Sequence, residues 1–405
     1  MQIIYAYAMS YIVVLILIAF IGMIAELSAS RHTLLQRQIY HLTFAAVAIW
    51  CTLKYAIGPD IQHYIPFYNA SYSFLQVPSH LHESLFEPGF VIFCSLLHTC
   101  GISFWGMTAI ISIFYFAVIF QLFKKIRGYQ TLALLMLVCL DYNLILMEFR
   151  QCLAVSFFYL FILLSEKKKY GWAMLMAILS STMHKSAIIV LALFGLLYLV
   201  GKVQVSKQEY ILLAALIIGL LCIPLQPLLL KVVEMLPLSP TQLVSAKHHL
   251  MVGVSFQKIL IVYLASILCL AYYSIPQGGN TRHHWLIWCG VALLVCLYPY
   301  WFLLNRLRSF FLPFLIVYIA NTVQSSEKKD VLMKQVYATI LVMYSVVLMI
   351  DIPQRNKQMR YPTDSISLVV ERCKYSEEEL QKRQMAQAEL YWDYDYKEMI
   401  KRGLQ

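Results

Sequence analysis

Charged side chains are scarce in this sequence. Asp, Glu, Lys and Arg make up 13% of its 405 residues, against about 25% in ordinary soluble domains. Hydrophobic residues make up 60%, which is more than a water-facing shell can cover, so a soluble enzyme is excluded. Apolar runs of ~20 residues, the length that spans the ~30 Å hydrocarbon core of a bilayer, recur along the chain. The composition predicts an all-α, polytopic membrane protein.

Several common motifs are also missing. None of the ten cysteines forms a CxxC pair, and nine lie in or beside apolar runs, so we interpret them as packing residues. The sequence has no HExxH pattern, and metal ligation is not expected. The first apolar run has neither a basic start nor an A-x-A cleavage site, and it is expected to be a retained helix rather than a signal peptide.

The apolar runs predict a transmembrane bundle of about 12–13 segments over residues 1–351. They cover residues 4–25, 38–56, 86–100, 104–123, 129–147, 150–165, 170–183, 186–201, 209–230, 257–274, 285–304, 309–323 and 334–351. Segment 86–100 is too short for a comfortable span, and we predict that it re-enters the membrane or lies partly in the interface. Residues 352–405 carry many charges of both signs and predict a short soluble helical tail.

Lys and Arg indicate the orientation of the bundle. Basic clusters in short loops, such as Lys124 to Arg127 and Lys167 to Lys169, should face the cytoplasm. The loop over residues 56–85 contains no Lys or Arg, so it is expected on the external side. The net charge of +11 is therefore interpreted first as a sign of orientation, and no nucleic-acid partner is expected.

Charges inside membrane segments cost about 2.5–3.5 kcal/mol on insertion scales, so each one suggests a function. With the predicted orientation, nearly all such charges lie at external ends of helices. They are Asp60, Glu87, Arg150, His184, Lys185, Arg306 and Arg308. This grouping on one face, with three arginines, fits an anionic lipid-linked diphosphate as the substrate.

Each of these residues also has a structural interpretation. Arg150 could reach the headgroups or pair with Glu148, or its planar guanidinium could bind phosphate oxygens. His184 could be a hydrogen-bonded packing residue or a proton-transfer group. Asp60 and Glu87 could be turn residues, or each could serve as a general base. The sequence leaves these alternatives open.

The external loop over residues 56–85 is rich in aromatic residues, namely Tyr64, Phe67, Tyr68, Tyr72 and Phe74. Such residues could form part of the interfacial aromatic belt of a membrane protein. They could equally form a floor on which sugar rings stack.

An ordered set of short motifs resembles a known family. Residues 54–60 with Tyr64 are similar to the Arg-Tyr-Gly-x-Gly-Thr-Asp…Tyr motif of EpsG-like exopolysaccharide polymerases, although Lys54, Ala56 and Pro59 depart from it. The motifs that follow in order are Glu87-Pro88-Gly89-Phe90, Arg150-Gln151-x-x-Ala154 and His184-Lys185-Ser186-Ala187. Arg306 fits an arginine near the start of a late helix.

The resemblance implies a Wzy-type, O-antigen-like polymerase with a GT-C-like fold in the bacterial cytoplasmic (inner) membrane. Such an enzyme joins oligosaccharide repeat units linked to polyprenyl (undecaprenyl) diphosphate at the external face of the bilayer. No cofactor is expected, and a flippase and a chain-length regulator are possible protein partners. The competing hypotheses are an O-antigen-ligase-like transferase and a flippase or transporter of the lipid-linked glycan.

Combined with the charge pattern, the resemblance predicts metal-independent glycosyl transfer. Arg150, Arg306 and Arg308 would hold the departing diphosphate. His184, Asp60 or Glu87 would accept the proton of the acceptor hydroxyl. The further substrate-binding candidates are Lys185, Gln151 and Tyr64.

Overall fold

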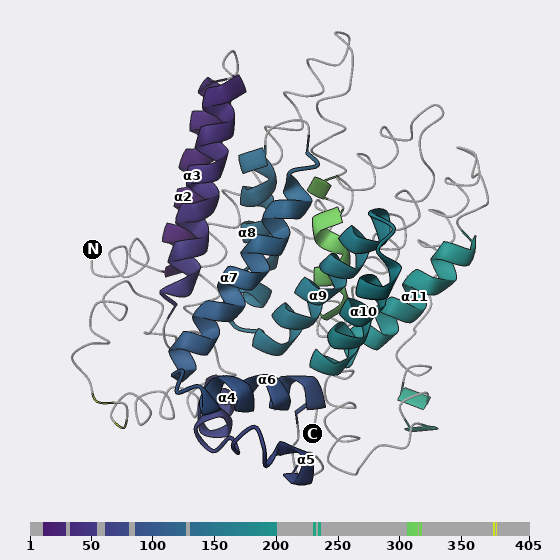
Figure 1. Cartoon of the computed structure of the whole chain (residues 1–405). Coiled ribbons are helices and arrows are strands. Elements are labelled where there is room, and N and C mark those ends of the chain that lie inside the picture. The colour runs from purple at the N-terminus through teal and green to yellow at the C-terminus, as the bar shows by residue number, and fades with distance from the viewer. Residues whose placement is uncertain are drawn as a thin grey trace. The chain divides into compact units, whose positions relative to one another are not determined.

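The structure is a computed structural model, and every element in the part of the chain that it describes is a helix. It describes residues 11–29, 33–54, 61–80, 86–126, 130–200, 230–231, 234–235, 306–314, 316–317, 376 and 378. The main helices are α2 (Tyr11–Ser28), α3 (Thr33–Thr52), α4 (Ile61–Asn69), α5 (Val77–His80), α6 (Pro88–Thr99), α7 (Phe104–Phe123), α8 (Gln130–Leu146), α9 (Phe149–Glu166), α10 (Tyr170–Met183) and α11 (Ser186–Val200) (Figure 1).

The chain divides into two compact units, and helices α2 to α10 belong to the first, which comprises Met1–Ile188 and Ala320–Asp395. In this unit, α2 packs against α3 and α8, while α9 packs against α7 and α10 (Figure 1). The short helices α4, α5 and α6 lie together at one end of the bundle. The second unit includes most of α11 and the helical residues 306–314.

The apolar runs coincide well with helices. The predicted segment 104–123 has the same bounds as α7, and segments 129–147, 150–165, 170–183 and 186–201 match α8 to α11 to within about one residue. Among the described residues, α7 and α9 are long and apolar enough to cross a bilayer, and three shorter apolar helices accompany them. An all-helical architecture with apolar helices is confirmed for this part of the chain, whereas the predicted count of 12–13 segments stays a prediction.

Segment 86–100 forms the 12-residue helix α6. At 1.5 Å per residue it is about 18 Å long, well short of the ~30 Å hydrocarbon core. Pro88 occupies its first turn, where a missing N–H costs nothing. Gly101, with a φ of +72°, lets the chain reverse into α7. The re-entry of segment 86–100 into the membrane stays a prediction.

Part of the predicted external loop is helical, because α4 and α5 lie within residues 56–85. Tyr64, Phe67 and Tyr68 share one face of α4 at the i, i+3, i+4 spacing of an amphipathic helix. Tyr64 and Tyr68 are buried, whereas Tyr72 and Phe74 are exposed. Phe67 is half-buried. The sugar-stacking hypothesis stays a prediction.

Tyr68 joins this end of the bundle to the start of α7. Its hydroxyl donates a hydrogen bond of 2.7 Å to the carbonyl oxygen of Ile102. Burial raises the pKa of the Tyr68 hydroxyl to about 12.

Both ends of α8 are bound by charged side chains from earlier segments. At its N-terminus, the Glu26 carboxylate of α2 accepts hydrogen bonds from the backbone N–H groups of Gln130 (3.2 Å) and Thr131 (2.8 Å). At its C-terminus, Lys54 Nζ donates to the carbonyl oxygen of Ile145 (2.9 Å). Helix ends leave backbone groups without intrahelical partners, and an anion at the N-terminus with a cation at the C-terminus matches the helix dipole. Glu26 and Lys54 thus bind backbone groups at the two ends of α8.

Candidate active site

The centre of the candidate site is an ion pair between Arg150 and Glu87. Arg150 is the second residue of α9, and Glu87 is the residue just before α6. Arg150 Nη1 lies 2.6 Å from Glu87 Oε2, and the exposed fractions of the two side chains are 21% and 7%. The structure therefore brings together two predicted site residues that are 63 positions apart.

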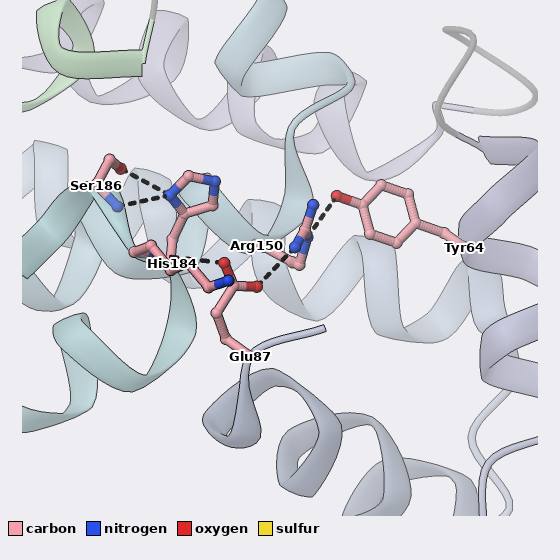
Figure 2. Close-up of polar contacts among 6 residues, drawn as sticks. Tyr64, Glu87, Arg150, His184 and Ser186 are labelled. Carbon is pink, nitrogen blue, oxygen red and sulfur yellow. Dashed lines mark hydrogen bonds and ion pairs between the residues drawn. The ribbon is translucent and has the colours of Figure 1, made fainter. Parts of the chain in front are cut away.

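Aromatic rings hold the guanidinium on its other sides. Arg150 Nε donates a 3.0 Å hydrogen bond to the Tyr64 hydroxyl (Figure 2). The guanidinium carbon lies 4.6 Å from the centre of the Phe86 ring and 5.7 Å from the centre of the Tyr64 ring. Such cation–π contacts are favourable, most of all away from water. Tyr64 is thus a partner of Arg150 in this structure, and the Phe86 contact was not predicted from the sequence.

Glu87 also binds the turn between α10 and α11. Its Oε1 accepts a 3.3 Å hydrogen bond from the backbone N–H of Lys185, while Oε2 binds Arg150 (Figure 2). The Lys185 side chain itself is exposed. One carboxylate therefore joins the beginning of α9 to the residue that follows His184.

A close approach between α6 and α10 explains why Glu87 reaches this turn. A Cβ atom added to Gly89 would lie 2.5 Å from Thr182 Oγ1 and 2.8 Å from the Thr182 carbonyl oxygen. Any side chain larger than hydrogen would push α6 away from the end of α10. The Glu-Pro-Gly motif therefore has three structural functions here: a carboxylate, a helix start and a close contact.

His184 ends α10 in an extended conformation, with a φ of −156° and a ψ of 133°. The backbone N–H of Ser186 donates to His184 Nδ1 (3.2 Å), and Ser186 Oγ lies 2.7 Å from the same nitrogen. A backbone N–H can only donate, so Nδ1 is an acceptor. In the neutral imidazole the proton is then on Nε2. Ser186 was not predicted as a site residue, although it directly follows the His-Lys pair.

The other predicted site residues are Gln151, Arg306, Arg308 and Asp60. Gln151 is fully buried within the bundle. Arg306 and Arg308 begin the helical residues 306–314 of the second unit, and Asp60 lies outside the described residues. Their predicted functions stay predictions.

Within the described residues, no group of three or more His, Cys, Asp or Glu side chains could hold a metal ion. The described site thus consists of a paired arginine, a carboxylate that makes two contacts, a histidine with an occupied Nδ1 and aromatic walls. This set of groups can bind an anion beside a hydrogen-bond donor.

Comparison with known proteins gives one family match. The model of the EpsG family matches residues 37–363, which is more than half of the chain and includes every residue of this cluster. Neither the curated proteins nor the solved structures include a match to the chain.

Proposed function

Because this chain belongs to the EpsG family, we propose that it is a membrane glycosyltransferase that polymerises polyprenyl-diphosphate-linked oligosaccharide repeat units. The reaction takes place at the external face of the bacterial cytoplasmic membrane. The proposal is supported most strongly by the Glu87–Arg150 pair and by the contact of Glu87 with Lys185, the residue after His184, because a guanidinium suits the oxygens of a diphosphate. The all-helical architecture and the apolar helices α7 and α9 fit an enzyme that takes both substrates from the bilayer.

The proposed reaction needs a group that stabilises the departing diphosphate. The bond between the donor sugar C1 and the phosphate oxygen breaks, and the acceptor hydroxyl oxygen forms a new bond to C1. Negative charge grows on the diphosphate as it leaves, and a fixed guanidinium lowers the energy of that charge. The described contacts of Arg150 use two of the five N–H donors of a guanidinium. We assign its other N–H groups to the diphosphate, with Arg306 and Arg308 as further candidates.

The contacts divide the predicted acid–base residues by function. Both Glu87 oxygens accept hydrogen bonds, one from Arg150 and one from Lys185, so we assign Glu87 to orienting the guanidinium. His184 Nδ1 accepts from Ser186, so we assign its Nε2–H to donating a hydrogen bond to a substrate oxygen. Asp60 is then the candidate base that takes the proton of the acceptor hydroxyl.

The proposal is tested with purified protein in lipid nanodiscs and a purified lipid-linked repeat unit, with EDTA present. We expect a ladder of products, each longer by one repeat unit. Arg150→Ala should abolish the ladder, whereas Arg37→Ala, which alters an exposed arginine of α3, should leave it unchanged.

Three outcomes would contradict the proposal. An unchanged ladder from the Arg150→Ala variant would overturn the assignment of the site. A single transfer to a different acceptor would indicate a ligase-like transferase. Movement of the lipid-linked unit across the bilayer without a new glycosidic bond would indicate a flippase.

A further inference from the structure

Lys54 is a buried lysine that has no function in the proposed reaction. It follows α3, and the residue is 3% exposed. Its Nζ donates a 2.9 Å hydrogen bond to the carbonyl oxygen of Ile145 and lies 4.8 Å from the centre of the Phe149 ring. Lys54 therefore contacts the last turn of α8 and the first residue of α9 at the same time.

The position of these contacts matters because they bracket the turn that precedes Arg150. Residues 147–148 join α8 to α9, and Arg150 follows Phe149 directly. The carbonyl of Ile145 is one of the last four of its helix, which lack intrahelical partners, and a cation there is favourable. Lys54 thus fixes both ends of the short turn.

A second route leads from Lys54 to Arg150 through aromatic rings. The Phe149 ring, which Lys54 contacts on one side, meets the Tyr64 ring edge to face at a centroid distance of 5.2 Å. The Tyr64 hydroxyl in turn accepts the hydrogen bond from Arg150 Nε. Lys54 is therefore connected to the Arg150 guanidinium in two ways: through the turn that precedes Arg150, and through the rings of Phe149 and Tyr64.

We propose that Lys54 is a positioning residue for Arg150, and that it supports diphosphate binding only by fixing the orientation of that guanidinium. This inference rests on the proposed function, in which Arg150 binds the diphosphate. The Lys54 ammonium is buried and binds the Ile145 carbonyl, so it does not itself contact substrate.

The test measures binding of farnesyl diphosphate, a soluble polyprenyl diphosphate, to the full-length protein in detergent. Lys54→Met should weaken binding by about tenfold, because the bond to Ile145 and the cation–π contact are both lost. Lys54→Arg should restore binding to within about twofold, because the cation is kept. Lys124→Met is the control. Lys124 makes a similar 4.7 Å contact with the Phe120 ring, but it follows the C-terminus of α7 and is not part of the cluster around Arg150.

A second pair of variants separates positioning from direct contact. In an Arg150→Lys background, Lys54→Met should weaken binding by less than about twofold, because there is no guanidinium left to orient. A further tenfold loss there would overturn the inference and show that Lys54 contacts the diphosphate directly.

Two further variants cover the case in which Lys54→Met does not fold. Phe149→Leu removes the ring that contacts both Lys54 and Tyr64, and it should also weaken binding of farnesyl diphosphate. Binding by Lys54→Arg is measured in the same experiment. Normal binding by Phe149→Leu together with lost binding by Lys54→Arg would contradict the inference. If the wild-type protein itself does not bind farnesyl diphosphate, the proposed function fails; if only the Lys54 variants bind normally, the Lys54 inference alone fails.

Discussion

Glu87 and Arg150 are 63 residues apart in the sequence, and their side chains lie 2.6 Å apart in the structure. The pair joins the start of α6 to the start of α9, and the second Glu87 oxygen extends the contact to Lys185 after α10. Three segments of the predicted external face therefore meet at one carboxylate.

Glu87→Gln should destabilise the protein and lower polymerisation. The amide can still accept the hydrogen bond from Lys185, but Arg150 loses its counter-charge in a mostly buried place. We expect a loss of about 1–3 kcal/mol, below the 3–5 kcal/mol of a fully buried pair. Thermal unfolding in detergent measures it. The double variant Glu87→Gln, Arg150→Gln should lose less unfolding free energy than the sum of the losses in the two single variants. If the losses simply add, the two side chains do not stabilise each other.

Tyr64→Phe should lower the polymerisation rate by about fivefold, because one hydrogen bond of about 1 kcal/mol to Arg150 is lost while the ring contacts remain. Rates with the lipid-linked repeat unit check this expectation. Tyr72→Phe is the matched control, since Tyr72 is exposed. An equal effect of both variants would show that the Tyr64 hydroxyl has no special function.

His184→Gln and His184→Asn should differ in activity. A glutamine amide nitrogen can occupy the place of Nε2, so this variant keeps the donor that we assign to the substrate. An asparagine side chain reaches only the place of Nδ1, where Ser186 is bound. We therefore expect measurable ladder formation from His184→Gln and none from His184→Asn. The opposite order would overturn the donor assignment.

Gly89→Ala should destabilise the fold and displace Glu87, because the new Cβ would lie 2.8 Å from the Thr182 carbonyl oxygen, a backbone atom. Overpacking of this kind costs about 1–3 kcal/mol. Gly171→Ala in α10 is the control, since a Cβ there meets nothing within 4 Å and alanine favours a helix by about 0.5–1 kcal/mol. Thermal unfolding of both variants should move in opposite directions.

Glu26→Ala should lower stability without abolishing chemistry. It removes the acceptor for two backbone N–H groups at the start of α8, which we expect to cost about 1–2 kcal/mol. The activity of the folded fraction should stay near wild type, because Glu26 lies at the opposite end of α8 from the turn before Arg150. Glu166→Ala is the control: Glu166 pairs with Lys125 where both side chains are exposed, and such pairs contribute about 0.2–1 kcal/mol.

The short motifs identified most members of the described cluster. Tyr64, Glu87, Arg150, His184 and Lys185 were all predicted, and the structure brings them together. In this cluster Lys185 donates its backbone N–H to Glu87, and the Tyr64 hydroxyl accepts a hydrogen bond from Arg150. The predicted binding of substrate by Lys185 and Tyr64 stays a prediction.

Local sequence determined where the helices lie. Apolar runs such as 104–123 coincide with helices. The hydrophobic pattern that favours a helix is contained within a single segment, so it can be recognised without knowledge of the tertiary structure. The partners of the few charged side chains depend instead on which helices pack together. The paired residues are 63 to 105 positions apart, and the sequence around each one does not indicate its partner. Tertiary structure alone decided that Lys54 binds the carbonyl end of α8 and that Glu87 binds Arg150, because a buried charge takes whichever partner the packing of helices places within reach.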